Sequence, residues 1–446
     1  MYPPKSLRML LCTCALVSLL TTTAQAESLA QIRYRLFQDP AAEVEPQLRE
    51  LASRGDHAAQ LLLANHLSGS SSAQRVGEAI ELYQRAFDQG HGELAALGRL
   101  ASVVANNNHY RRRTQAFFQD AVQRYPQLRD FDSLSTTLEV FLVYPEDFQP
   151  AQVAELIELY RRACVKDCIS LTYRGALAEK QGQPSKAEGY YRRAMLEDPR
   201  AVDRYYQILG ERQDEVFQAY AKSLSERMDE LPLGVVQGIG SLLSGIAGEK
   251  ENNGALTWLN YAVEHGSVAA MQSKASYMMA LATEYDPTDV FALLDRIEAQ
   301  QPQQGRALRA SAYLVRAWQS TLDPYKAYEL IRGLLDEGYQ NAYLNLGELY
   351  SMGGLDEVDQ LQAIQAYQQL TEQGVASAFY RIARIYNRGK GICHDKAKAY
   401  AYARIAVDYG ELGARQLLGE LETEISPQEL AEAQHAREDI LKNVKI

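Results

Sequence analysis

The sequence predicts an all-α, right-handed α-solenoid built of about ten helix-turn-helix repeats. Three glycines recur every 36 residues, and a fourth lies two such periods earlier in the chain. An alanine precedes each of these glycines by eleven residues, and a small or medium apolar residue precedes each by four. A fixed period of this size indicates stacked helical pairs that cannot bury their apolar faces alone. The glycines are Gly266, Gly338, Gly374 and Gly410, and Gly90 closes an N-terminal copy.

Residues 1–26 have the features of a secretory signal peptide. Lys5 and Arg8 form a short basic region, an apolar stretch from Met9 to Leu20 follows, and Ala24-Gln25-Ala26 is a small-x-small cleavage site. The apolar stretch is shorter than the roughly 20 residues needed to cross a bilayer. We therefore expect a soluble, exported periplasmic chain that starts near Glu27.

The five cysteines raise two questions, lipidation of the leader and pairing in the mature chain. Cys12 and Cys14 lack the small residue that precedes a lipidated cysteine, so a lipid anchor is the less favoured alternative. Cys164 and Cys168 lie four residues apart at the predicted end of a helix, where they either form a local disulfide or remain two free thiols. Cys393 is then unpaired, and we expect it to be buried within its repeat.

The mature chain divides into three parts. Residues 27–55 are predicted to be N-terminal capping helices, 56–410 the repeat superhelix and 411–446 C-terminal capping helices. Within a unit, helix A is followed by a turn and helix B, and the closing glycine supplies a left-handed C-cap. Small residues in helix A let it approach its neighbour closely. They are Ala342, Ala378 and Ala414, with Gly347, Ala383 and Gly419 five residues later. We expect one extended superhelix rather than two separate domains.

Composition narrows the class of partner. The net charge of −11 argues against nucleic acid, because phosphate binding needs a basic surface. The chain has 28 tyrosines against 10 phenylalanines, which suits helical repeats, since a tyrosine ring packs between helices while its hydroxyl reaches water.

No group of residues predicts an active site, so we expect no catalytic residue, cofactor or metal, and no enzyme activity. The compact cluster of ligand types is Cys393-His394-Asp395, but neighbouring residues in a turn cannot all face one ion. Gly389-Lys390-Gly391 lacks the preceding strand and the full glycine pattern of a phosphate-binding loop. We interpret it as the turn between two helices.

Two further segments are unusual. Glycine and serine recur from Gly234 to Gly248, which predicts either a closely packed helix or a membrane-facing surface, with close packing favoured. Arg111-Arg112-Arg113 is a basic spot in an acidic protein. It is either a solvated turn, the favoured interpretation, or a contact for an anionic partner.

The repeated pattern A-x-x-x-L-G-x-x-Y, followed by A-x-x-W/Y-x-x-A and glycine, resembles the Sel1-like repeat family. The matching residues are Ala342, Leu346, Gly347, Tyr350, Ala363 and Gly374, then Ala378, Ile382, Ala383, Tyr386, Ala399, Tyr402, Ala406 and Gly410. Weaker units look more like tetratricopeptide (TPR-like) repeats. The resemblance implies protein–protein scaffolding and no catalysis.

An exported chain of about ten such mixed units also resembles the alginate-export scaffolds. Segments 79–86 and 399–410 are of the kind found there. This resemblance implies a position at the outer membrane, with an outer-membrane polysaccharide porin and periplasmic polymer-modifying or synthesis proteins as partners. The alternatives are a generic Sel1-like adaptor and a direct polysaccharide-binding module that uses exposed tyrosines. The acidic surface argues against the latter for an anionic polymer such as alginate.

Overall fold

The computed structural model describes residues 27–39, 42–69, 73–89, 94–106, 110–124, 131–163, 167–246, 254–355, 357–411 and 413–444. Within these ranges every regular element is a helix, and the prediction of an all-α fold is confirmed. None of the described helices combines the length and the apolar character that a membrane span requires.

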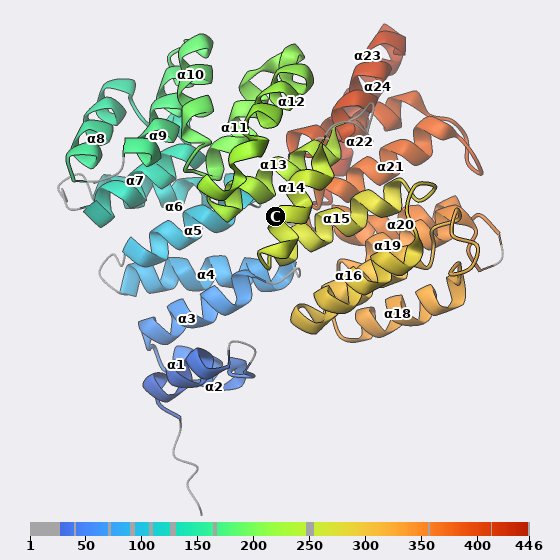
Figure 1. Cartoon of the computed structure of the whole chain (residues 1–446), viewed down its shortest axis with the longest axis horizontal. Helices are drawn as coiled ribbons and strands as arrows, with labels where there is room; N and C mark the ends of the chain where they lie inside the picture. The colour runs from blue at the N-terminus through green and yellow to red at the C-terminus, as the bar shows by residue number, and fades with distance from the viewer. Residues whose placement is uncertain are drawn as a thin grey trace, which may run out of the picture.

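The first third of the chain forms short helices that stack upon one another (Figure 1). Serine at position 28 caps the first of them, with its side chain accepting from the backbone nitrogen of Gln31. The helices are α1 (Leu29–Gln38), α2 (Glu45–Ser53), α3 (His57–Ser68), α4 (Ala73–Gln89), α5 (Leu94–Asn106), α6 (Arg111–Arg124), α7 (Phe131–Val143), the 3-10 helix η2 (Pro145–Asp147) and α8 (Pro150–Ala163).

The middle third continues the stack. Helix α9 packs on α10, α13 on α14, and α16 on α17. The helices are α9 (Asp167–Lys180), α10 (Pro184–Ala194), α11 (Arg200–Ile208), η3 (Gly210–Arg212), α12 (Gln213–Leu224), η4 (Ser225–Glu230), α13 (Leu233–Gly245), α14 (Ala255–Glu264), α15 (Val268–Ala280), α16 (Pro287–Gln300) and α17 (Pro302–Ala312).

The last third carries the most regular repeats. Helix α19 packs on α20 and α21 on α22, while α24 packs back on α22. The helices are α18 (Pro324–Asp336), α19 (Ala342–Met352), α20 (Gln360–Thr371), α21 (Ala376–Arg388), α22 (Lys396–Asp408), α23 (Ala414–Glu424) and α24 (Pro427–Lys442).

The apolar core follows the chain as a series of adjoining clusters. One cluster takes buried side chains from Ile32 to Ala176, the next from Leu171 to Trp318, and smaller ones follow to Ala433. Each cluster draws on neighbouring helices, as expected when every repeat contacts only the repeats beside it. The core therefore extends along the solenoid instead of forming one central mass.

The repeat glycines end their helices as predicted. Their φ angles are +84° at Gly266, +80° at Gly338, +75° at Gly374 and +94° at Gly410. The residue after each glycine donates its backbone N–H to the carbonyl of the aligned apolar residue four positions before the glycine, which is a Schellman-type C-cap. The bonds run from Ser267 to Ala262 (2.9 Å), Tyr339 to Leu334 (2.8 Å), Val375 to Leu370 (3.0 Å) and Glu411 to Ala406 (2.8 Å). Gly90 lies outside the described residues.

The small residues of helix A are covered by a neighbouring side chain in some repeats and left uncovered in another. A Cβ placed on Gly347 would lie 2.4 Å from Cε1 of Tyr367, whose buried ring covers the glycine. Gly175 and Tyr191 make the same contact earlier in the chain. At Gly419 the prediction of close approach is wrong, since nothing lies within 4 Å of the added Cβ. The reason is that α24 packs on α22 and leaves that face of α23 open.

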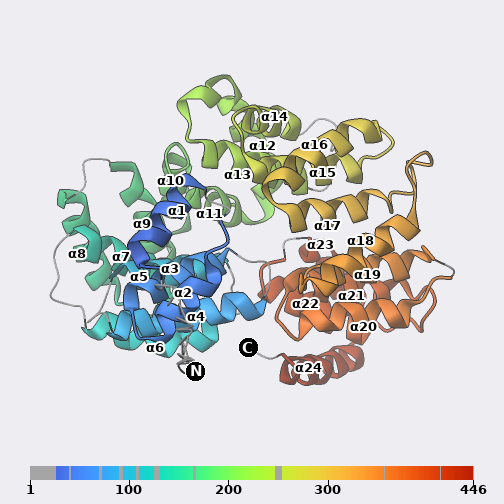
Figure 2. The same cartoon turned by 90° about the horizontal axis from the view of Figure 1, so that it is seen from below.

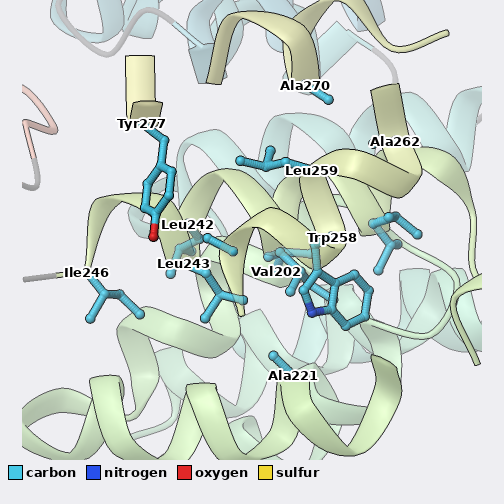
Figure 3. Close-up of a cluster of buried hydrophobic side chains, with 14 of the residues drawn as sticks. Val202, Ala221, Leu242, Leu243, Ile246, Trp258, Leu259, Ala262, Ala270 and Tyr277 are labelled. Atoms are coloured by element: carbon cyan, nitrogen blue, oxygen red, sulfur yellow. The ribbon is translucent and has the colours of Figure 1, made fainter. Parts of the chain in front are cut away.

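Residues 234–245 of the glycine-rich segment belong to α13, and this described part confirms close packing. A Cβ on Gly240 would lie 3.0 Å from Cδ2 of Leu259 and from Cβ of Trp258. Figure 3 shows these two side chains of α14 among Leu242, Leu243 and other buried residues. An added Cβ here would be tighter than an ordinary van der Waals contact, so the side chains of α14 would have to shift by a few tenths of an ångström to accommodate it.

The superhelix curls more than an extended array would. In Figure 1 the chain rises on one side, crosses the middle, descends on the other side to α18 and then rises again to α23. Figure 2 shows the helices of the first third facing those at the C-terminal end. Residues of α6, α11, α22 and α24 line one shared hollow, which places the two ends of the solenoid beside each other.

Candidate functional site: an arginine-lined hollow between the ends

The hollow has a volume of about 910 Å³ and is open to solvent. One wall comes from α6, α7 and η2, a second from α11, and the third from the ends of α22 and α24. We call this space the closure hollow. Its lining includes Arg111, Arg112, Asp203, Arg204, Tyr409 and Leu441.

Arg111 is a structural residue of the first wall. Its guanidinium pairs with both carboxylate oxygens of Glu146 at 2.5 Å, and its Nε donates to the carbonyl of Val143 at 2.9 Å. It also lies over the ring of Tyr144, 5.3 Å from the ring centroid. The Tyr144 hydroxyl in turn donates to the carbonyl of Arg111 at 2.7 Å. These contacts hold η2 against the start of α6.

The other two arginines of the triplet point to different surroundings. Arg113 pairs with Glu81 of α4 at 2.7 Å. Arg112 has no carboxylate within ion-pair distance in the part of the chain that the structure describes. Its charge acts on Tyr409 across the hollow, where burial raises the pKa of the Tyr409 hydroxyl and Arg112 partly offsets the increase. The interpretation of the triplet as a turn is wrong, because all three residues belong to the first turn of α6.

The start of α11 carries a buried ion-pair network. Asp198 is 4% exposed and accepts from Nε of Arg200 at 2.9 Å and from the hydroxyl of Thr172 at 2.6 Å. Arg200 also pairs with Glu139 of α7, which accepts from the Tyr173 hydroxyl at 2.8 Å. The Arg200 guanidinium is therefore committed to the wall. It ties α11 to α7.

The next turn of α11 faces the hollow with one charge of each sign. Arg204 donates from Nη2 to the carbonyl of Leu142 at 2.9 Å, and no described carboxylate pairs with it. Asp203 is exposed within the hollow. The surrounding walls reduce its access to bulk water, and this desolvation raises the pKa of its carboxyl, with Arg204 opposing the increase.

The C-terminal wall is partly apolar. Tyr409, Leu441 and Val444 are half-buried and pack on the last core cluster. Asp408 is held by Arg437 at 2.9 Å and by Arg404 at 3.2 Å, so its charge is matched within the wall. The hollow thus combines aliphatic surface with two guanidinium groups, those of Arg112 and Arg204, that lack a carboxylate partner.

Among the predicted cysteine features, the structure describes the side chain of Cys393. Cys12, Cys14 and Cys164 lie outside the described residues, and the side chain of Cys168 is likewise not described. The expectation that Cys393 is buried is wrong, since its thiol is free and exposed. It sits in the turn between α21 and α22, where the backbone at Gly389 and Gly391 has positive φ and turns away from the core.

The other motif of that turn has a local structural role. Asp395 caps α22 by accepting from the backbone nitrogen of Lys398 at 2.9 Å. Across the described ranges, no three His, Cys, Asp or Glu side chains come together in a way that could hold a metal ion.

Sequence reasoning found the arginine triplet but not the hollow. Arg204 and Tyr409 are separated from the triplet by many repeats, and nothing in the periodicity indicates that they meet. The only available signal was the triplet itself, a basic spot in a chain of net charge −11.

No protein-family model matches the chain. Over 108 residues the sequence is 37% identical to the alginate biosynthesis protein AlgK of Azotobacter vinelandii, a stretch that covers 24% of this chain. The match spans only 23% of the length of that relative.

Two solved structures align with most of the chain, at low sequence identity and with low TM-scores. A protective antigen of uropathogenic Escherichia coli strains, which displays an SLR fold, covers 90% of this chain and aligns over 95% of its own, with 16% identity and a TM-score of 0.25. A Sel1 repeat protein from Oxalobacter formigenes covers 93% and aligns over 91% of its own, with 15% identity and a TM-score of 0.27. The solenoid assignment rests on the helices and C-caps described above. Within the described residues the chain is an all-helical repeat protein, and over 108 residues it is similar to AlgK.

Proposed function

We propose that this protein is a periplasmic scaffold that holds other proteins together in the export of an exopolysaccharide, with alginate as the polymer. The observation that carries the proposal is the 37% identity to AlgK over 108 residues. In this proposal the chain links an outer-membrane polysaccharide porin to periplasmic proteins that synthesise or modify the polymer.

The described structure supports a binding role. A solenoid presents a long surface relative to its core, and its exposed positions vary without disturbing the repeat contacts. Side chains exposed on separate helices include Phe37 of α1, Tyr325 of α18 and Leu361 of α20. The proposal assigns no catalytic activity to the chain.

The proposed targeting and organisation complete this picture. Residues 1–26 serve as a cleaved export signal, 27–55 and 411–446 cap the array, and Cys164 and Cys168 form either a local disulfide or two thiols. Intact mass of the mature protein from the native envelope decides cleavage and lipidation. A mass that includes a lipidated Cys12 or Cys14 would replace the soluble form with an anchored one.

Affinity purification from the native envelope tests the scaffold function. We expect the tagged chain to bring down an outer-membrane porin together with periplasmic polymer-modifying or synthesis proteins, and deletion of its gene to abolish polymer secretion. Recovery of cytosolic partners alone, with secretion intact after deletion, would refute the proposal. Direct retention on immobilised polymer with no protein partner would favour the polysaccharide-binding alternative.

A further inference from the structure

We propose that the closure hollow binds an acidic, partly apolar peptide segment of a protein partner, with Arg112 and Arg204 contacting its carboxylates. This inference rests on the proposed scaffold function and adds the site and the chemistry of one partner contact. Its basis is the set of charges and apolar side chains that the curl of the solenoid brings together.

Two positive charges of the hollow have no carboxylate partner in the described part of the chain. Glu146 and Asp408 each pair with an arginine of their own wall, and Glu139 pairs with Arg200 of the neighbouring wall. Arg112 and Arg204 have no carboxylate partner among the described residues. Charge-assisted bonds between a guanidinium and a carboxylate are among the strongest hydrogen bonds available at a surface. Arg204 bonds to the Leu142 carbonyl and to the Tyr191 side chain, so it is the remaining N–H donors of these two guanidinium groups that favour an anionic ligand.

Apolar side chains also line part of the walls of the hollow. The half-buried Val143 and Pro145 lie on the first wall, and the half-buried Leu441 and Val444 on the third. A peptide can cover such aliphatic surface with its own apolar side chains while its carboxylates reach the arginines. A polyuronate carries carboxylates but has no aliphatic side chains to bury. The mixed lining therefore favours a peptide over a polysaccharide.

The guanidinium of Arg204 is oriented before a ligand arrives. Its Nη2 is fixed by the Leu142 carbonyl, and α11 is tied to α7 through Arg200 and Glu139. A donor that is already ordered loses less conformational entropy on binding. Arg112 reaches the same space from α6, so one peptide segment can contact both.

The carboxylate of Asp203 opposes the binding of an acidic peptide. It is the carboxylate of the hollow that lies exposed beside Arg204 and repels an acidic ligand. Removing its charge with Asp203→Asn is expected to strengthen peptide binding a few-fold, whereas Arg112→Ala weakens it about tenfold, which corresponds to about 1.4 kcal/mol.

The test uses the full mature chain in its native envelope. A photo-cross-linking residue, p-benzoylphenylalanine, replaces Gln207, which is exposed on the wall of the hollow. The cross-linked partner peptide is identified by mass spectrometry and synthesised, and its Kd is measured for wild type, R112A and D203N. Arg332→Ala on α18 is the matched control, because Arg332 is an exposed arginine outside the hollow.

The inference predicts cross-links to a segment of a protein partner that contains Asp or Glu next to apolar residues. It also predicts weaker binding by R112A, tighter binding by D203N and no change for R332A. Where Arg204→Ala perturbs the wall, Arg204→Lys keeps the charge but loses the guanidinium fork, and is expected to retain only part of the affinity.

Several outcomes would overturn it. Cross-links to this chain alone, a cross-linked segment without acidic residues, or equal Kd values for wild type and R112A each refute the peptide site. Polymannuronate that displaces no peptide but binds in an Arg112-dependent way would assign the hollow to the polysaccharide instead. If R112A still captures every envelope partner that wild type captures, the scaffold function stands and only this inference fails.

Discussion

Substitution of Gly347 by alanine is the sharpest probe of how the repeats pack. The new Cβ would lie 2.4, 2.6 and 2.7 Å from Cε1, Cζ and Cδ1 of Tyr367. Favourable carbon–carbon contacts lie at about 3.5–4.0 Å, so the ring has to move by about 1 Å. Tyr367 is only 2% exposed, so its ring is enclosed by neighbouring side chains. Helix α19 and α20 must therefore separate or distort.

The expected magnitude combines two opposing effects. Overpacking of a well-filled core costs about 1–3 kcal/mol, and glycine to alanine in a helix interior gains at most about 1 kcal/mol. We expect G347A to lower the free energy of unfolding by about 1–2 kcal/mol. Gly419 is the matched control, because it occupies the same repeat position with nothing within 4 Å of the added Cβ. G419A should leave stability unchanged or raise it slightly.

The assay is urea unfolding followed by far-UV circular dichroism, with hydrogen exchange of α19 and α20 added because a solenoid can unfold in stages. A double-mutant cycle with Tyr367→Leu should show a coupling of about 1 kcal/mol, since the shorter side chain makes room for the new methyl group. The packing argument fails if G347A is as stable as wild type, or if G347A and G419A change stability equally.

Three further substitutions test separate features. Trp318 donates from Nε1 to the carbonyls of Ala282 (2.8 Å) and Tyr285 (3.0 Å), so Trp318→Phe should cost about 1–3 kcal/mol in urea unfolding, and an unchanged midpoint would contradict this. Gly374 has a φ of +75°, so Gly374→Ala should cost about 1–2 kcal/mol by thermal denaturation, and an unchanged melting temperature would show that the cap is not strained. Burial raises the pKa of the Tyr144 hydroxyl to about 12 from its ordinary value of 10.0. The stability that the protonated hydroxyl contributes to the fold is therefore fully present below pH 10 and is lost as pH rises through about 12. Difference absorbance titration of wild type against Tyr144→Phe should reveal a hydroxyl that ionises near pH 12, whereas one that ionises near pH 10 would contradict the buried environment.

The periodic features could be predicted from the sequence because they depend on short stretches of chain. The C-cap at Gly338 needs only the left-handed conformation of one glycine and a bond from Tyr339 to Leu334, five residues apart. A 36-residue pattern of such caps leaves little choice but stacked helical pairs. The close packing of α13 on α14 also followed from its glycines, since small residues on one helix face allow close approach.

The exceptions arise where a residue's neighbours come from another repeat or from an irregular turn. Gly419 carries the repeat signature, yet α24 packs on α22 and leaves it uncovered. Cys393 lies in a turn whose direction depends on two positive-φ glycines, so its residue type did not predict its exposure. Sequence periodicity specifies a position within the repeat but not what lies beyond it.

The sequence by itself determined the fold class, the helix ends at the repeat glycines and the lack of a recognisable catalytic motif, because each depends on residue type and local spacing. Only the tertiary structure decided that Arg112 of α6 and Tyr409 at the end of α22 line the same hollow. The curl of a solenoid is the sum of small rotations between many successive repeats. A slight difference in packing at each interface changes that sum greatly, so the meeting of the two ends is a property of the whole array and of no single segment.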